Sequence, residues 1–136
     1  MVRIVLVMHE PMGVAFSACA EHVLGRRPDL AVFDVPPDGK PDDLVPRLEQ
    51  LLMQHPDDET LVLCDLYGAT PFNIAVRTLK SCMSKGLVAH LITGTNVCMV
   101  LKALTDQSRE PEKLAERVRQ GALRGIVSAD EACCSA

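Results

Sequence analysis

The fold is decided by residues 60–72, which read TLVLCDLYGATPF. Thr60 to Cys64 form a short apolar run bounded by polar residues, which is typical of a parallel strand covered on both faces. Asp65 closes the run, and Thr70-Pro71 is a typical helix start, with Thr70 as N-cap and Pro71 as the first helical residue. The segment therefore predicts a strand, a loop and a helix, with Asp65 at the carboxyl end of the strand.

Runs of the same kind lie on either side of this segment. Val2 to Met8 is also strongly apolar, and Leu30 to Val35 and Leu87 to Ile92 are weaker examples. Between the runs, apolar residues recur at helical spacing. The three sets are Phe16, Ala20, Val23 and Leu24; Leu44, Leu48, Leu51 and Leu52; and Phe72, Ala75, Val76 and Leu79.

The ends of these helices also carry signals. Gly25 is predicted to end the first helix, and Asp43 to cap the second, so that Pro46 falls in a first turn where its missing amide is tolerated. Beyond the fourth strand, the pattern predicts helices at Val97 to Leu104 and Glu112 to Ala122 and a short final strand at Gly125 to Ser128.

Alternating strands and helices imply right-handed crossovers and a parallel sheet. We predict an α/β fold with an open, mostly parallel four-stranded sheet, helices on both faces and a short C-terminal strand that a dimer could exchange. A chain of 136 residues suits one domain, placed at residues 1–128, with a flexible tail at 129–136. In such sheets, ligands bind beyond the carboxyl ends of the strands, where the strand order reverses.

Composition narrows the function classes. The formal net charge is -4, the basic residues are scattered, and aromatic residues are few, so nucleic-acid binding is not expected. The apolar run at Val2 to Met8 ends at His9-Glu10 and is too short for an export signal, so a cytoplasmic protein without membrane insertion is expected.

The six cysteines predict neither disulfides nor a metal site. Cys19, Cys64, Cys82 and Cys98 lie in apolar periodic segments, where a free Cys behaves as a small hydrophobe. The adjacent pair Cys133-Cys134 is not a CxxC motif and has no His at ligand spacing, so we read it as part of a loose tail and expect no metal and no cofactor.

His9 and Asp65 form the candidate chemical site. They end the first and third predicted strands, so neighbouring strands would bring them together. A carboxylate that accepts the Nδ1 hydrogen of an imidazole fixes its tautomer and leaves the Nε2 lone pair free to attack. His9 is therefore the predicted nucleophile and Asp65 its orienting partner.

The predicted helix start at Thr70-Pro71 would lie beside His9. Free amides and the positive end of a helix dipole suit a phosphate group, and the Thr70 hydroxyl adds a donor. Gly68 and Ala69 keep the approach open. Each feature alone is more often structural, but nucleophile, orienting carboxylate and anion site together favour function. His22, His55 and His90 lack such a setting and are predicted to be structural.

His9 at a strand end, the segment DLYGATPFN at 65–73 and Gly94-Thr95-Asn96 resemble the IIA component of the mannose family of the sugar phosphotransferase system, over nearly the whole chain. The resemblance implies that His9 accepts a phosphoryl group from the phosphocarrier HPr and passes it to a IIB component. It also implies that Asp65 orients His9, that Thr70 contacts the phosphate with a loop of Gly68, Ala69 and Pro71, and that the protein is a homodimer with an exchanged C-terminal strand.

Two positions depart from the family pattern. Glu10 follows the histidine where the family has glycine, and Cys98 follows Asn96-Val97 where the family has proline. Glu10 brings a negative charge to the site, and both positions bear on which partner docks at this rim.

Three other classes of protein share parts of this pattern. A receiver domain phosphorylated on Asp65 would need an acidic pair at the end of the first strand, where Met8-His9 stands. A mononucleotide- or flavin-binding domain would need a glycine-rich fingerprint after Met8. A regulatory protein that is phosphorylated on His9 and binds partners accordingly, without sugar transport, stays open, as does the identity of any sugar.

Overall fold

The computed structural model describes residues 2–130. Along the chain it contains β1 (Arg3–His9), α1 (Met12–Leu24), β2 (Ala31–Val35), α2 (Pro41–Leu52), β3 (Thr60–Cys64), α3 (Thr70–Ser84), β4 (Ala89–Ile92), α4 (Val97–Thr105) and α5 (Pro111–Gly125). The predicted alternation of strands and helices is confirmed, and the ends predicted for the strands and for the last two helices differ by at most three residues. Among the described residues, no helix combines the length and apolar character needed to cross a membrane.

The four strands form one parallel sheet in the order β2-β1-β3-β4. His9 pairs with Val35 on β2, and on the other side of β1 the ladder ends with Val7 opposite Cys64. The chain moves to one side of β1 to form β2 and to the other side to form β3, so the order reverses between β1 and β3. Ligand sites in open α/β sheets form at this reversal.

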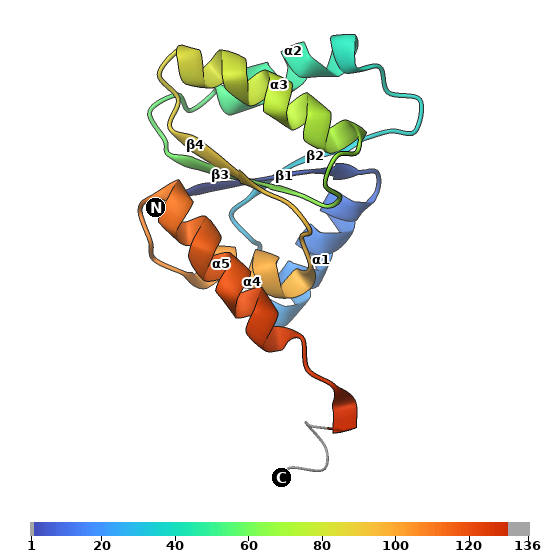
Figure 1. The fold of residues 1–136 in the computed structure, drawn as a ribbon, viewed down its shortest axis with the longest axis vertical. Coiled ribbons are helices and arrows are strands. Elements are labelled where there is room, and N and C mark those ends of the chain that lie inside the picture. Colours follow the sequence, from blue (N-terminus) through green and yellow to red (C-terminus); the bar gives the residue numbers. More distant parts are fainter. Residues whose placement is uncertain (1, 131–136) are drawn as a thin grey trace.

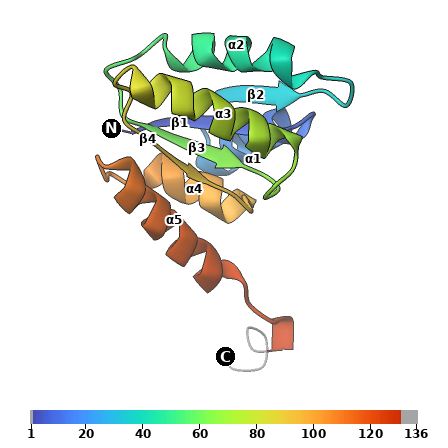
Figure 2. The same ribbon diagram turned by 45° about the horizontal axis from the view of Figure 1, so that its top comes forward.

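Helices cover both faces of the sheet, as predicted. Figures 1 and 2 show α2 and α3 on one face and α1, α4 and α5 on the other. Strand side chains alternate between the faces. Along β1, Ile4, Leu6 and Met8 pack in the core under α1, α4 and α5, whereas Val5 and Val7 pack under α2 and α3. Burying each such side chain contributes about 1.5–3 kcal/mol.

Of the two predicted helix boundaries, the end of α1 is confirmed and the start of α2 is not. Gly25 ends α1 in the left-handed conformation, with φ 69°, as predicted. The prediction for Asp43 was wrong, because α2 begins earlier, at Pro41, with Lys40 as N-cap and no side-chain cap. Pro46 consequently lies inside the helix.

The strand predicted at Gly125 to Ser128 is not formed within the described chain. Gly125 is the last residue of α5, and residues 126–128 pair with no strand of the described chain. Ile126 and Val127 are exposed, at 71% and 54%. Ala129 and Asp130 are helical, and the rest of the predicted tail, with Cys133 and Cys134, lies outside the described residues. A paired C-terminal strand would therefore need a second chain, and exchange stays a prediction.

Candidate functional site

The predicted contact between His9 and Asp65 is present at the carboxyl edge of the sheet. His9 Nδ1 lies 2.9 Å from Asp65 Oδ2, and the His9 backbone N–H donates to the same oxygen at 2.9 Å. The other carboxylate oxygen, Oδ1, accepts the backbone N–H of Leu66 at 2.9 Å. The Asp65 side chain is only 13% exposed. It is therefore held in one orientation, and so is the ring beside it.

This contact sets the chemistry of the His9 ring. An ionised carboxylate only accepts hydrogen bonds, so the proton of a neutral imidazole resides on Nδ1. Nε2 then carries the lone pair. The His9 side chain is 45% exposed, so a partner can reach this nitrogen. By strand alternation, His9 follows Val5 and Val7 toward the face covered by α2 and α3. The His9 ring therefore lies on the same side of the sheet as α3.

The loop between Asp65 and α3 leaves room for another group to approach its backbone closely. Gly68 has φ 78°, a conformation that L side chains rarely adopt, and no atom lies within 4 Å of the position of a Cβ there. Asn73 closes the loop, since its side-chain amide donates to the Gly68 carbonyl at 3.3 Å. Glycine leaves open a surface that a side chain would cover.

The prediction that Thr70 caps α3 was wrong. The N-cap is Ala69, which reaches the helix in an extended conformation, with φ -81° and ψ 176°. Its carbonyl accepts the first helical hydrogen bond from the Asn73 N–H at 3.0 Å. Thr70 is thus the first helical residue and Pro71 the second, and no side chain caps this helix. The exposed Thr70 hydroxyl is not committed to a cap.

Two other helix N-termini at this edge are already capped by side chains. Asp34 on β2 accepts the N–H of Gly13 at 2.8 Å and of Val14 at 3.1 Å, which closes the start of α1. Asn96 accepts the N–H of Met99 at 2.9 Å and closes the start of α4.

The remaining two N-termini differ in charge. The first turn of α2 carries Asp42 and Asp43, which offset the positive end of its dipole. The first turn of α3 has neither an acidic residue nor a side-chain cap. Among the four helices that begin at this edge, α3 is therefore the one whose first amides and dipole stay available to an anion.

Thr95 and Asp34 are supporting residues whose roles sequence reasoning missed. The Thr95 hydroxyl and backbone N–H both donate to the Cys64 carbonyl, at 2.7 and 3.2 Å, one residue before Asp65. Thr95 is buried and ties the loop after β4 to the end of β3. The Gly94-Thr95-Asn96 segment was the available signal for Thr95, but nothing local to Asp34 indicates that it reaches α1.

Cys64 is the other potential nucleophile at this edge. Burial, followed by the nearby Asp65 charge, raises the pKa of its thiol to about 12. A buried neutral thiol does not compete with an exposed imidazole for an electrophile.

An exposed apolar rim adjoins the site. Leu66 and Tyr67, which directly follow Asp65, are 59% and 77% exposed. The Tyr67 ring packs on Phe72 of α3, with centroids 5.0 Å apart. Met12 and Val14 at the start of α1 are also exposed. Several exposed apolar side chains on neighbouring segments are typical of a protein-docking surface.

The other histidines lie apart from this arrangement. His55 Nδ1 is 4.0 Å from Asp58 Oδ2 in an exposed turn, His22 is on α1, and His90 is on β4. In residues 2–130, no three His, Cys, Asp or Glu side chains are grouped closely enough to hold a metal ion.

The fold and site define a doubly wound α/β protein with a carboxylate-oriented histidine at the switch point of its sheet. Residues 3–119 match the family model EIIA-man, described as PTS system fructose IIA component. The chain belongs to this family, the mannose-type IIA components of the sugar phosphotransferase system.

Solved structures agree with this fold. A mannose/sorbose-specific IIA subunit from Enterococcus faecalis has a TM-score of 0.85 at 22% identity, with 95% of each chain covered. The phosphotransferase component EIIA from Streptococcus agalactiae gives 0.83 at 22% identity, covering 94% of this chain and 97% of that one. A IIA protein associated with the fucose utilization operon of Streptococcus pneumoniae gives 0.75 at 17% identity, covering 96% and 98%.

Proposed function

We propose that this protein is a cytoplasmic phosphohistidine carrier that accepts a phosphoryl group from HPr on Nε2 of His9 and passes it to a IIB component. The observation that carries the proposal is the 2.9 Å contact between His9 Nδ1 and Asp65 Oδ2, which leaves Nε2 as the exposed nucleophile. Family membership supplies the reaction class.

The transfer balances without a cofactor. The Nε2 lone pair attacks phosphorus, the bond from phosphorus to the HPr histidine breaks, and its electron pair stays on that histidine. The proton on Nδ1 of His9 does not move, and Asp65 stabilises the positive charge that the ring gains. In the second transfer the phosphorus–Nε2 bond breaks in the same way toward a nucleophile of the IIB component.

The start of α3 would hold the phosphoryl oxygens. Its first N–H groups lack intrahelical acceptors, and the Thr70 hydroxyl adds one donor. Pro71 has no N–H, so its part is to fix the backbone, while Gly68 and Ala69 leave room for the oxygens. No basic side chain is needed in this scheme, because backbone dipoles supply the positive potential.

The openness of the site supports a protein as phosphoryl donor. A half-exposed histidine beside exposed Leu66 and Tyr67 suits docking of another protein surface, whereas a small-molecule phosphoryl donor would need an enclosing cleft.

Intact-mass analysis tests the proposal. The full chain is incubated with phosphoenolpyruvate, enzyme I and HPr, and we expect a mass gain of one phosphoryl group, labile in acid and stable in alkali. His9→Ala should gain nothing, and the matched control His22→Ala should be labelled like the wild type. Equal labelling of His9→Ala would refute the assignment.

Glu10 is the observation that favours a regulatory variant of this function. It is exposed, directly follows the phosphoryl acceptor and adds a negative charge to the docking rim. A regulator would be phosphorylated by HPr in the same way but would not pass the group on. Phosphorylated protein mixed with a IIB component of its own organism separates the two functions, since only a carrier loses the phosphoryl group to IIB.

We also propose that two copies form a dimer by exchange of the segment after α5. Ile126 and Val127 are exposed and unpaired in the described chain, and β4 is an edge strand with open backbone groups. Ile126→Glu should produce monomers by light scattering, whereas the control Val23→Glu, on the exposed face of α1, should leave the oligomeric state unchanged. A dimeric Ile126→Glu variant that folds normally would exclude the exchange.

A further inference from the structure

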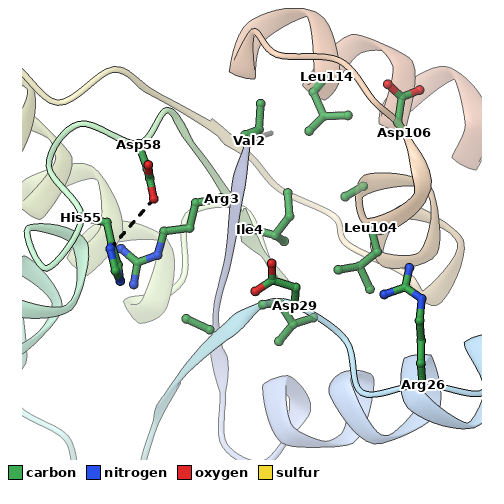
Figure 3. Close-up of a pocket in the computed structure, with 13 residues that line it drawn as sticks. Val2, Arg3, Ile4, Arg26, Asp29, His55, Asp58, Leu104, Asp106 and Leu114 are labelled. Atoms are coloured by element: carbon green, nitrogen blue, oxygen red, sulfur yellow. Dashed lines mark ion pairs between the residues drawn. The ribbon is translucent and has the colours of Figure 1, made fainter.

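A pocket of about 510 Å³ lies at the amino edge of the sheet, opposite the end that carries His9. It is formed where β1 and β2 begin, with the turn after α2, the end of α4 and the start of α5 around it. Figure 3 shows Arg3, His55 and Asp58 along one side, Arg26 and Asp106 along the other, and Ile4 and Asp29 between them. The volume falls in the range of small-molecule sites.

The floor of the pocket is apolar and rigid. Val2 and Ile4 of β1, Leu104 of α4 and Leu114 of α5 are each less than 10% exposed and belong to one core cluster. A ligand with an aliphatic side chain would gain free energy by removing its own apolar surface from water against this floor.

Arg3 keeps part of its hydrogen-bonding capacity free. Its Nη1 donates to the carbonyls of Leu51 and Leu52 at the end of α2, at 3.0 and 3.3 Å. The N–H groups on Nε and Nη2 bond to no residue of the described chain. Burial lowers the pKa of Arg3, although Asp58 and Asp29 act to raise it. The geometry leaves a half-buried guanidinium whose unused donors favour an anionic partner.

The other lining charges divide into engaged and unengaged groups. Asp106 accepts hydrogen bonds from Arg117 and the Ser108 amide and is therefore engaged. His55 Nδ1 lies 4.0 Å from Asp58 Oδ2. Arg26 and Asp29 make no ion pair or side-chain hydrogen bond within residues 2–130. The pocket thus presents unengaged groups of both signs beside an apolar floor.

We propose that this pocket binds a free α-amino acid with an aliphatic side chain, such as leucine. The carboxylate binds Arg26, the ammonium binds Asp29, and the side chain covers Ile4 and Leu104, while the half-buried Arg3 on the facing side of the pocket adds positive charge. A simple anion would be repelled by Asp29 and Asp58, and a simple cation by Arg3 and Arg26, whereas a zwitterion suits both sets. This proposal is independent of phosphoryl transfer at His9.

Titration of the ¹⁵N-labelled full chain with L-leucine, followed by NMR, tests the proposal. We expect saturable shifts of the Ala31 and Leu104 amides. Three analogues each remove one feature: 4-methylpentanoate lacks the ammonium, 3-methylbutylamine lacks the carboxylate, and glycine lacks the side chain. Each should bind at least about tenfold more weakly, the loss expected for one charged contact or one buried side chain. Absent shifts with leucine, or an analogue that binds equally, would overturn the proposal.

Two variants test the contacts directly. Arg26→Gln and Asp29→Asn should each weaken leucine binding by about tenfold, while the matched controls Arg27→Gln and Asp57→Asn, outside this pocket, should bind normally. Both test positions are exposed, so the variants should fold, which the same spectra verify. Normal binding by both test variants would refute the site. Arg26→Gln should still be phosphorylated by HPr, so failure of one proposal is distinguishable from failure of the other.

Discussion

The two edges of the sheet differ in what they leave unsatisfied. At the carboxyl edge, Asp34 caps the start of α1 and Asn96 caps the start of α4. Acidic residues in the first turn of α2 offset the positive end of its dipole, so among these helices only the start of α3 stays open to an anion. At the amino edge, Arg3 satisfies the last carbonyls of α2, and Asp106 pairs with Lys102 and Arg117 between α4 and α5. The carboxyl edge thus keeps one directed anion site, whereas the amino edge keeps a pocket of mixed charge.

This difference follows from the direction of the helices relative to the sheet. Backbone N–H groups point out of helix starts and carbonyls out of helix ends, so the carboxyl edge of a parallel sheet with rising helices suits anions. A nucleophile there needs only one orienting carboxylate. At the amino edge, side chains must supply the positive charge that the exposed carbonyls require.

Substitution of Asp65 should have the largest effect on the carboxyl edge. In Asp65→Asn, the side-chain amide can donate to Nδ1 and hold the ring with its proton on Nε2, so transfer from HPr should slow by at least about a hundredfold. Asp34→Asn is the matched control, since it changes a carboxylate of the same edge that caps α1 and does not touch His9. Stopped-flow or quench measurements of labelling check this, and unchanged rates in Asp65→Asn would reduce Asp65 to an anchor.

Substitution of Asp106 should have the largest effect on stability at the amino edge. Its side chain is 2% exposed. Burial acts to raise its pKa, but hydrogen bonds from the Ser108 amide, Arg117 and Lys102 outweigh burial and lower it. Asp106→Asn should cost about 2 kcal/mol at neutral pH, the loss of charged hydrogen bonds.

The same shift predicts a pH dependence. A carboxyl group whose pKa is lowered in the folded state stabilises the protein at pH values above its pKa in the unfolded chain, which is about 4. This stabilisation is lost as the pH falls through the pKa of the folded state. Urea unfolding between neutral and acidic pH should therefore show a smaller acid-induced loss in Asp106→Asn than in the wild type. Parallel losses in the two proteins would contradict the pairing.

Two glycines should respond to alanine with opposite signs. A Cβ at Gly13 would lie 2.4 Å from Asp34 Oδ1 and 2.6 Å from Val32 Cγ1, so Gly13→Ala should destabilise by about 1–2 kcal/mol and loosen the cap of α1. At Gly121, within α5, the nearest atom is Cγ of the flexible Lys102 at 3.4 Å. Gly121→Ala should stabilise by about 0.5–1 kcal/mol. Equal shifts in thermal melting would contradict this contrast.

The smallest expected change in stability is at Thr70. Because Ala69 is the N-cap, Thr70→Ala should change the free energy of unfolding by less than about 0.5 kcal/mol. It should nevertheless shorten the lifetime of the phosphoryl group on His9, since one proposed donor is lost. A stability loss of about 1 kcal/mol with an unchanged lifetime would indicate a cap and not a phosphate contact.

The sequence predicts this fold well where a local pattern carries the information. The apolar runs and helical spacings indicate each strand and helix, and the strand-end positions of His9 and Asp65 indicate their contact. The start of α3 was misplaced because the approach of the backbone at Ala69, and not the side chain of Thr70, decides the cap. Similarly, α2 begins before Asp43, because Lys40 enters the helix in an extended conformation and Pro41 is the first helical residue.

Contacts between distant residues explain the rest of what was missed. Asp34 reaches Gly13 across 21 positions, and Arg3 reaches Leu51 across 48. The charged residues of the amino-edge pocket come from several separate segments, none of which carries a motif. Such arrangements depend on the packed tertiary structure and have no local signature.

The His9 ring nitrogen that carries the phosphoryl group shows directly whether Asp65 orients the ring for transfer. Because Asp65 binds Nδ1, the phosphoryl group should be attached to Nε2. ¹⁵N chemical shifts of the labelled imidazole in phosphorylated protein distinguish the two ring nitrogens. We expect phosphorylation on Nε2, with Nδ1 still protonated toward Asp65, whereas phosphorylation on Nδ1 would refute the proposed role of Asp65.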